Sequence, residues 1–254
     1  VKISFVLLIA VLLRERTDIK RVLLSAVIAA VHGIILVASR DLGAALIFFV
    51  SYLMMLYVAT KQKAYLFIGL IAGFFACIAA YYLFAHVRVR VQTWLHPFAD
   101  FYGKGNQIGN SLFGIGTGGW FGMGLYRGMP EKIPVVDKDF VFAAISEEMG
   151  ALYALCVLFL CLGCYMQFML IAMKMQAMFY KLIAFGLGSV YITQVFLTIG
   201  GVTKFIPSTG VTLPLVSYGG SSIVSTFIIF QVIQGLYVLK RGEEEEEENS
   251  SEEE

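Results

Sequence analysis

The sequence predicts an all-α polytopic integral membrane protein, and two properties of its 254 residues support that prediction. First, 59% of the residues are hydrophobic, 15% are charged and the mean hydropathy is +0.79, which leaves too little polar surface for a water-soluble globule. Second, the apolar residues gather into segments close to the length that crosses the hydrocarbon layer of a bilayer. Lipid is therefore the expected solvent for most of the chain.

Six apolar segments predict full transmembrane helices, and a shorter apolar run precedes them. The run Ile3–Leu13 meets Arg14 after eleven residues, short of the roughly 20 that a membrane-spanning helix needs. Because no small-residue cleavage site follows, we interpret it as one helix truncated at the N-terminus rather than as a signal peptide. The six full segments are Val22–Ser39, Ala44–Thr60, Ala64–Ala85, Met149–Met173, Leu182–Val202 and Ser222–Leu239.

The connections between these segments alternate in charge and predict the orientation. Four of them are rich in basic residues: Arg14, Arg16, Lys20 and Arg21, then Lys61 and Lys63, then Lys174 and Lys181, then Lys240 and Arg241. The positive-inside rule makes these four cytoplasmic, so Arg40–Gly43, His86–Glu148 and Thr203–Ser221 are expected outside. Residues 1–241 would form the membrane domain, and residues 242–254, with nine of the eighteen acidic residues, a disordered acidic cytoplasmic tail.

The long outer segment His86–Glu148 contains ten glycines and both tryptophans of the chain. A loop of this length between spans is usually functional or disordered, and its apolar residues argue against disorder. It does not resemble a phosphate-binding loop, because no Lys-Ser or Lys-Thr pair follows the glycines, and no nucleic-acid partner is predicted. We expect a partly re-entrant loop in which glycine lets the backbone approach a neighbouring backbone or a ligand.

Asp139 stands where this outer loop turns into the next apolar segment, a position at the mouth of a membrane cavity. Glycosyl transfer from a lipid-linked diphosphate needs a base for the acceptor hydroxyl and positive charge for the leaving group. Asp139 suits the first role, although from spacing alone a helix N-cap or an ion pair with Lys138 is the simpler explanation. Glu147 and Glu148 fit a structural pair at a helix junction as well as a catalytic one. The candidate cations are Arg88, Arg90, Lys132, Lys138 and Lys204.

The segment Phe205–Ser222 combines two prolines, three glycines and six serine or threonine residues between two spans. Such a segment can bend into the membrane while its hydroxyl groups satisfy the backbone groups that the bend frees. Asp41 has a simpler interpretation, as the N-cap of a helix that begins near Ala44.

Several of these motifs together resemble one protein family. Lys132–Gly150 resembles Leu-Pro, then Thr-Asp-Phe-Ile-Phe-Ala, then Glu-Glu-Leu-Gly in the shape, elongation, division and sporulation family, which includes RodA, FtsW and SpoVE. Pro207–Ser222 resembles the family's Pro-x-Thr-Gly, Leu-Pro and Ser-Tyr-Gly-Gly-Ser-Ser motif. Three further blocks match in family order: Asp41–Leu46, Arg88–Pro97 and Gly105–Gly124.

The resemblance implies a peptidoglycan glycosyltransferase that polymerises lipid II at the outer face of the bacterial cytoplasmic membrane. It implies that Asp139 is the catalytic aspartate, and it admits a divalent cation, Mg²⁺ or Mn²⁺. The implied partners are lipid II, a class B penicillin-binding protein and membrane lipid. The substrate-binding residues expected from the matching motifs and their basic neighbours are Arg88, Arg90, Gln107, Glu131, Lys138, Lys204, Ser217 and Tyr218.

The chain departs from the family pattern at several places. Val135, Asp137 and Lys138 replace the usual Glu, His and Thr before the aspartate, and His96 stands where an Asp is common. Val1-Lys2 resembles the end of a Gln-Pro-Ser-Glu-Phe-x-Lys motif, so the first three family helices are expected to be missing from this chain. A lipid II flippase and a non-catalytic scaffold for a penicillin-binding protein remain the alternative functions.

Overall fold

The computed structural model describes residues 1–15 and 18–252, with side chains described as far as Gly242. Arg16 of the first basic cluster lies outside the described residues. Nearly all of the expected acidic tail, residues 242–254, lies beyond the described side chains, so its disorder stays a prediction. The elements are α1 (Lys2–Leu13), α2 (Ile19–Ala38), α3 (Leu42–Thr60), α4 (Lys63–Leu83), α5 (Ala85–Leu95), α6 (Asn106–Gly118), the 3₁₀ turn η1 (Pro130–Lys132), α7 (Val141–Lys174), α8 (Met178–Val202) and α9 (Gly220–Glu252).

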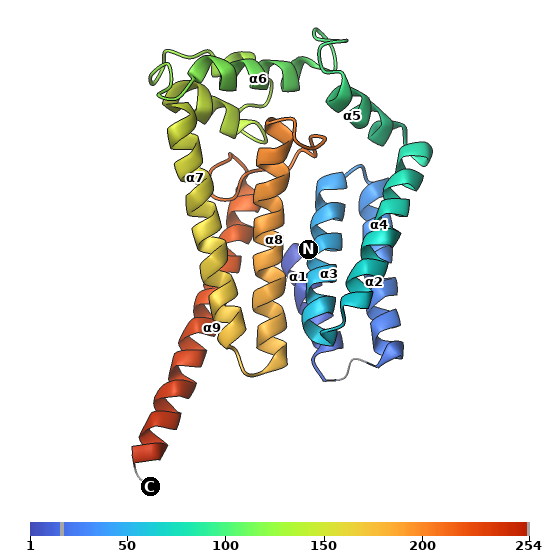
Figure 1. Cartoon of the computed structure of the whole chain (residues 1–254), viewed down its shortest axis with the longest axis vertical. Helices are drawn as coiled ribbons and strands as arrows, with labels where there is room; N and C mark the ends of the chain where they lie inside the picture. The colour runs from blue at the N-terminus through green and yellow to red at the C-terminus, as the bar shows by residue number, and fades with distance from the viewer. Residues whose placement is uncertain (16–17, 253–254) are drawn as a thin grey trace.

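The helices form an antiparallel bundle whose long members run up and down in sequence order (Figure 1). Six of the described helices are long and apolar enough to cross a membrane, and they coincide with the six segments predicted from the sequence. α1 is the short apolar helix expected before them. The connections α1–α2, α3–α4 and α7–α8 lie at one end of the bundle, which the positive-inside rule predicts to be cytoplasmic (Figure 1).

Local signals explain where α3 begins and ends. Asp41 is its N-cap, and the carboxylate Oδ1 accepts a hydrogen bond of 2.9 Å from the backbone N–H of Ala44. At the other end Lys61 takes a left-handed conformation with φ of 54° and closes the helix. The predicted capping role of Asp41 is therefore confirmed, and it satisfies one of the N–H groups that a helix start leaves without a partner.

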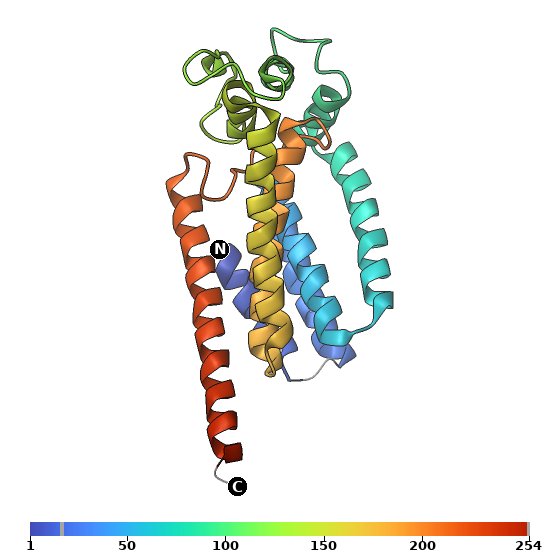
Figure 2. The same ribbon diagram turned by 60° about the vertical axis from the view of Figure 1, so that its left-hand side comes forward.

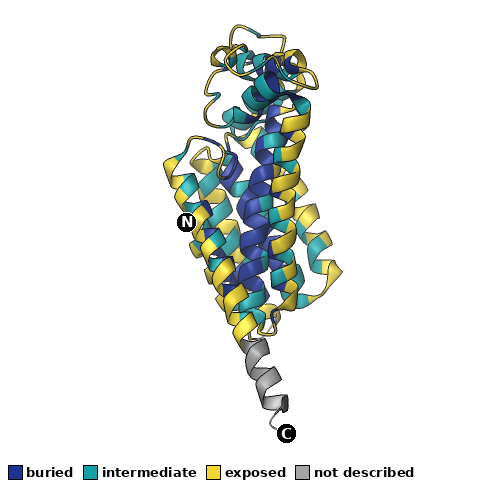
Figure 3. Ribbon diagram, turned by 90° about the vertical axis from the view of Figure 1, so that its left-hand side faces the viewer, coloured by how far each residue is buried: buried dark blue, intermediate teal, exposed yellow. Residues whose placement is uncertain are grey.

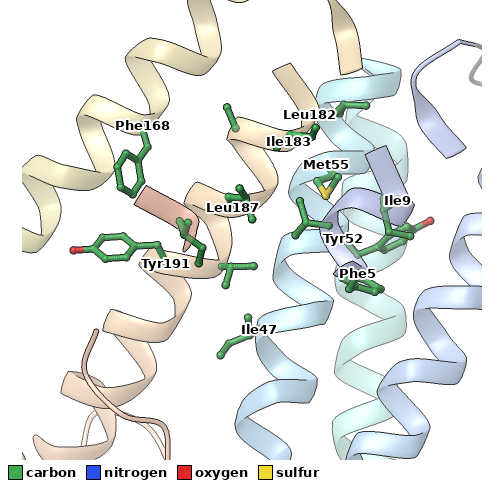
Figure 4. Close-up of a cluster of buried hydrophobic side chains, with 14 of the residues drawn as sticks. Phe5, Ile9, Ile47, Tyr52, Met55, Phe168, Leu182, Ile183, Leu187 and Tyr191 are labelled. Carbon is green, nitrogen blue, oxygen red and sulfur yellow. The ribbon is translucent and has the colours of Figure 1, made fainter. Parts of the chain in front are cut away.

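The core of the bundle is built around α8, which α3 and α7 contact most extensively. Figure 3 shows the buried residues concentrated in the middle of the bundle, and none of α4 is buried. Figure 4 shows how Ile47 and Met55 of α3 face Leu187 and neighbouring residues of α8. In lipid such contacts stabilise the bundle through close van der Waals packing, because the hydrophobic effect gives little preference for helix over lipid tail.

Residues 86–148, predicted as a long outer loop, form most of α5, α6, η1 and the first turns of α7, and they lie across the outer end of the bundle (Figures 1 and 2). Glycines permit the close approaches that this cover requires. A Cβ atom on Gly118 would collide with the carbonyl oxygen of Ser146, so α6 can pack directly against the backbone of α7.

The segment between α8 and α9, residues 203–219, turns back between the helices and is called here the re-entrant segment. The hydroxyl of Thr198 donates to the carbonyl of Val211 at 2.8 Å, and the amide of Gln194 donates to the carbonyl of Thr212 at 2.9 Å. Gln194 lies eight residues before the end of α8 at Val202, so the segment descends about 12 Å along that helix. Figure 2 shows α9 beginning well below the outer end of α8, as this descent requires.

Candidate active site at the outer end of the bundle

Asp139 lies in the turns immediately before α7, with its carboxylate half-buried against the re-entrant segment. A Cβ atom on Gly210 would lie 3.9 Å from Oδ2 of Asp139, and Gly210 has a φ of +73° that a residue with a side chain rarely adopts. Asp139 is not a helix cap, because the N-cap of α7 is Phe140 and makes no side-chain cap bond. No ion pair within 4 Å joins it to Lys138 in the part of the chain that the structure describes.

The surroundings of Asp139 make its carboxylate more basic than that of a free aspartate. Burial raises the pKa of Asp139, because an ionised carboxylate loses hydration when it is partly enclosed. The positive charges of Arg90 and Lys138 oppose this rise in pKa, while Asp137 adds to it. A raised pKa together with nearby positive charge suits a group that accepts a proton during a reaction.

Arg90 and Trp94 of α5 hold the re-entrant segment from the outside. Nη1 of Arg90 donates to the carbonyl of Ser208 at 2.8 Å, and Nε1 of Trp94 donates to the carbonyl of Lys204 at 2.9 Å. These bonds place the guanidinium of Arg90 between α5 and the segment that faces Asp139, and leave other N–H groups of that guanidinium for an anion.

Arg88, expected to act with Arg90, faces elsewhere. Its Nη2 donates to the carbonyl of Tyr82 at 3.1 Å, and its guanidinium carbon lies 5.8 Å from the centre of the Tyr81 ring. Two residues along a helix is about 200° of rotation, so the two arginines of α5 point to different sides. The structure thus brings Arg90, and not Arg88, to Asp139.

The other predicted substrate-binding residues lie at several places at the outer end of the bundle, some buried and some exposed. Ser217 is buried and its Oγ accepts from the backbone N–H of Leu213 at 2.8 Å, so it shapes a turn of the re-entrant segment. The neighbouring Tyr218 is 74% exposed, while its backbone N–H donates to the carbonyl of Asp137 at 2.7 Å. The remaining four are Gln107 in the first turn of α6, Glu131 in η1, Lys138 beside Asp139, and Lys204 just after α8.

Glu147 and Glu148 have the structural role that the sequence left open. Glu147 Oε1 accepts from the backbone N–H of Met129 at 3.0 Å, and Glu148 Oε1 accepts from that of Tyr126 at 3.1 Å. Both carboxylates therefore fix the loop between α6 and η1. Because α7 begins at Val141, the helix that carries these two residues does not include Asp139.

A polar junction inside the bundle was not expected from the sequence. Nζ of Lys2 donates to Oε1 of Gln194 at 2.9 Å, and Nε2 of Gln194 donates both to the carbonyl of Thr212 and, at 3.1 Å, to Oγ of Ser222. The hydroxyl of Thr212 also donates to Oγ of Ser222 at 2.8 Å. The signal in the sequence was the presence of a lysine and a glutamine, Lys2 and Gln194, inside mainly apolar segments.

This junction borders a cavity of about 400 Å³ between α1, α3 and the re-entrant segment. Lys2, Asp41, Thr212 and Ser222 line it, and so does Gly210, which faces Asp139 as well. Gly210 therefore borders both this cavity and the carboxylate of Asp139.

Comparison with known proteins gives a consistent match. The family model for FtsW, RodA and SpoVE, described as cell cycle protein, matches residues 1–241. The chain is 42% identical over 199 residues to the peptidoglycan glycosyltransferase RodA of Mycobacterium tuberculosis strain H37Rv, covering 78% of this chain and 42% of that protein. It is 36% identical over 196 residues to the stage V sporulation protein E of Bacillus subtilis strain 168, covering 75% and 52%.

A third relative, the probable peptidoglycan glycosyltransferase FtsW of Aeromonas salmonicida, is 32% identical over 239 residues, covering 90% of this chain and 60% of that protein. The chain thus spans about half the length of these curated relatives. A solved structure of a peptidoglycan synthase complex that coordinates polymerization and crosslinking has the same fold, with a TM-score of 0.78 at 24% identity, covering 94% of this chain and 68% of that one.

Proposed function

Because the chain belongs to the FtsW, RodA and SpoVE family of cell cycle proteins, we propose that it polymerises lipid II into glycan strands at the outer face of the bacterial cytoplasmic membrane. The names of its relatives support a peptidoglycan glycosyltransferase. The observation that carries the proposal is the half-buried carboxylate of Asp139, with a raised pKa, beside Arg90 and the re-entrant segment at the outer end of the bundle.

In the proposed reaction Asp139 removes the proton from a sugar hydroxyl of the acceptor. The acceptor oxygen forms a bond to the anomeric carbon of the donor sugar, and the bond from that carbon to the diphosphate oxygen breaks. The proton passes to the carboxylate of Asp139, and undecaprenyl diphosphate leaves with the electron pair. Arg90 compensates the negative charge that develops on the diphosphate.

A divalent cation fits this site as a companion of the diphosphate. No group of three or more His, Cys, Asp or Glu residues that would enclose a metal occurs within the described residues. Asp139 offers one carboxylate, and Mg²⁺ commonly binds through one or two carboxylates together with water and substrate phosphates. Mg²⁺ or Mn²⁺ would supply additional positive charge to the diphosphate there.

The partners that we propose are those expected for the FtsW, RodA and SpoVE family. The neighbouring solved structure belongs to a peptidoglycan synthase complex of polymerization and crosslinking, which supports a class B penicillin-binding protein as the crosslinking partner. Membrane lipid is the expected partner of the exposed apolar faces of the spanning helices in the described part of the chain. An aligned relative that acts in sporulation and others named FtsW and RodA support roles in spore formation, division or elongation.

Gel analysis of lipid II polymerisation tests the proposal, with the chain assayed alone and extended to the full length of its relatives. Asp139→Asn keeps the shape of the side chain and removes its basicity, so we expect glycan polymer from the wild type and none from this variant. Asp18→Asn is the matched control, because Asp18 is an exposed carboxylate before α2, at the opposite end of the bundle, and makes no side-chain cap bond.

Polymer from the Asp139→Asn variant would place the catalytic base elsewhere. Movement of labelled lipid II across vesicles without chain growth would indicate a flippase. If the protein only stimulated a penicillin-binding protein, and did so equally with Asn at position 139, it would be a scaffold.

A further inference from the structure

Residues 119–129, called here the aromatic loop, expose large apolar side chains at the outer end of the bundle. Trp120 is 62% exposed, Phe121 83%, Leu125 60% and Tyr126 96%. A contiguous group of this kind on the outside of a protein marks a surface that contacts something else. The aromatic loop takes no part in the proposed chemistry, so it needs a separate explanation.

The aromatic loop is a fixed structure, because α7 opens at Gly150 to hold it. Gly150 has φ of 86° and ψ of 170°, which interrupts the helix and frees backbone groups on both sides. The N–H groups of Ala151 and Leu152 donate to the carbonyls of Gly119 and Trp120 at 2.8 and 3.2 Å. The aromatic loop also donates two backbone bonds of 2.9 Å in return, to the carbonyls of Glu147 and Glu148.

These bonds fix the depth of the aromatic loop relative to the membrane. The helical part of α7 after the break runs from residue 151 to Lys174, which at 1.5 Å per residue is about 36 Å, close to the roughly 30 Å of a hydrocarbon layer. With Lys174 at the cytoplasmic surface, Leu152 lies at the outer edge of the hydrocarbon. Trp120, bonded to Leu152, lies at the same level.

The chemistry of the aromatic loop suits that level. Trp and Tyr gather at membrane–water interfaces because an apolar ring ends in a polar group, and Arg127 adds a positive charge suited to lipid phosphates. The exposed surface continues down α7 through Leu152 and Tyr153, which are 46% and 48% exposed and belong to a predicted membrane span. The aromatic loop therefore extends a lipid-facing surface to the headgroups.

We propose that the aromatic loop is an interfacial anchor that inserts Trp120, Phe121, Leu125 and Tyr126 into the headgroup region of the outer leaflet. The anchor is joined through Glu147 and Glu148 to the first turns of α7, which begin two residues after Asp139. Insertion of the aromatic loop thereby sets the height at which the carboxylate of Asp139 stands above the hydrocarbon. This proposal does not depend on which reaction Asp139 performs.

Tryptophan fluorescence tests the anchor directly, because Trp94 and Trp120 are the only tryptophans in the sequence. The Trp94→Phe variant in lipid nanodiscs reports Trp120 alone, and Trp120→Phe reports Trp94, which is half-buried and bonded to Lys204. Lipids brominated near the glycerol quench the fluorescence of shallow tryptophans, and lipids brominated near the bilayer centre quench that of deep ones. Acrylamide dissolved in water quenches tryptophans that face water. Should Trp94→Phe fail to fold, the wild-type signal minus that of Trp120→Phe gives the same quantity.

We expect Trp120 to be quenched most by the shallow bromolipid, less by the deep one, and less by acrylamide in nanodiscs than in lipid-free detergent. Replacing both Phe121 and Leu125 by Asp should shift Trp120 emission to longer wavelength and raise its acrylamide quenching, with helix content unchanged. Strong acrylamide quenching with no bromolipid quenching would overturn the proposal. So would shielding that occurs only when a crosslinking partner protein is added, which would make the aromatic loop a protein-docking surface.

Discussion

Replacing Gln194 by Leu would test whether the polar junction inside the bundle holds the re-entrant segment in place. Gln194 is only 3% exposed, and its side chain makes three hydrogen bonds, one from Nζ of Lys2 and two to Thr212 and Ser222. Leu has a similar volume, so the change creates little empty space. It leaves the ammonium of Lys2 and the carbonyl of Thr212 without these partners.

The size of the effect follows from the bonds that are lost. In water a neutral hydrogen bond contributes about 0.5–1.5 kcal/mol and one to a charged group about 1.5–3 kcal/mol, whereas bonds inside membranes average roughly 0.6 kcal/mol. Loss of the three bonds of Gln194 should therefore lower the free energy of unfolding by about 2 to 6 kcal/mol. We expect about 3 kcal/mol, because the site lies between the hydrocarbon layer and the water outside.

Equilibrium unfolding in mixed micelles, followed by circular dichroism, measures this loss of unfolding free energy. Gln92→Leu is the matched control, since Gln92 is exposed on α5, and its stability should change by less than about 0.5 kcal/mol. In a double-mutant cycle, Gln194→Leu and Lys2→Met should couple rather than add. Wild-type stability for Gln194→Leu, or strict additivity with Lys2→Met, would refute the role of the junction.

Because burial raises the pKa of Asp139 above its unfolded value of 3.8, wild-type stability should fall as pH rises through the raised pKa. Asp139→Asn should therefore gain unfolding free energy over wild type toward neutral pH, and equal stability at all pH values would contradict the shift. The wild-type polymerisation rate should rise as pH rises through the raised pKa of Asp139. Lysine lacks the planar guanidinium with which Arg90 can bond the Ser208 carbonyl and a diphosphate at the same time. Arg90→Lys should therefore lower polymerisation about tenfold or more in a gel assay while folding persists. Gly118→Ala should cost several kcal/mol or prevent folding in a thermal unfolding assay, because its Cβ collides with backbone, whereas Gly116→Ala, in open space, should be tolerated.

The membrane architecture was predictable from the sequence alone. Apolar segments of spanning length occur where the structure has its six long helices, and the basic connections lie at one end as the charge pattern predicted. Capping by Asp41 was predictable for the same reason, since it depends on residues only three positions apart. Partition into lipid, helix formation and capping are local properties that a short stretch of chain determines.

The candidate site was only partly predictable. The sequence identified Asp139 and Arg90, and the structure places both against the re-entrant segment. It also grouped Arg88 with Arg90, although helix geometry turns the former away toward Tyr82. Whether Asp139 caps α7 depended on where that helix begins, and the exact start of a helix is poorly defined by sequence.

By itself the sequence determined which of the described segments are long and apolar enough to cross a membrane, which end of the bundle is basic and which carboxylate lies at the opposite end. Only the tertiary structure decided that Lys2 meets Gln194, 192 residues away, that Arg90 meets Ser208, 118 residues away, and that an opened α7 carries the aromatic loop. The reason is physical: lipid selects apolar segments one at a time, whereas a buried polar group needs a partner, and which partner it finds depends on how all the helices pack.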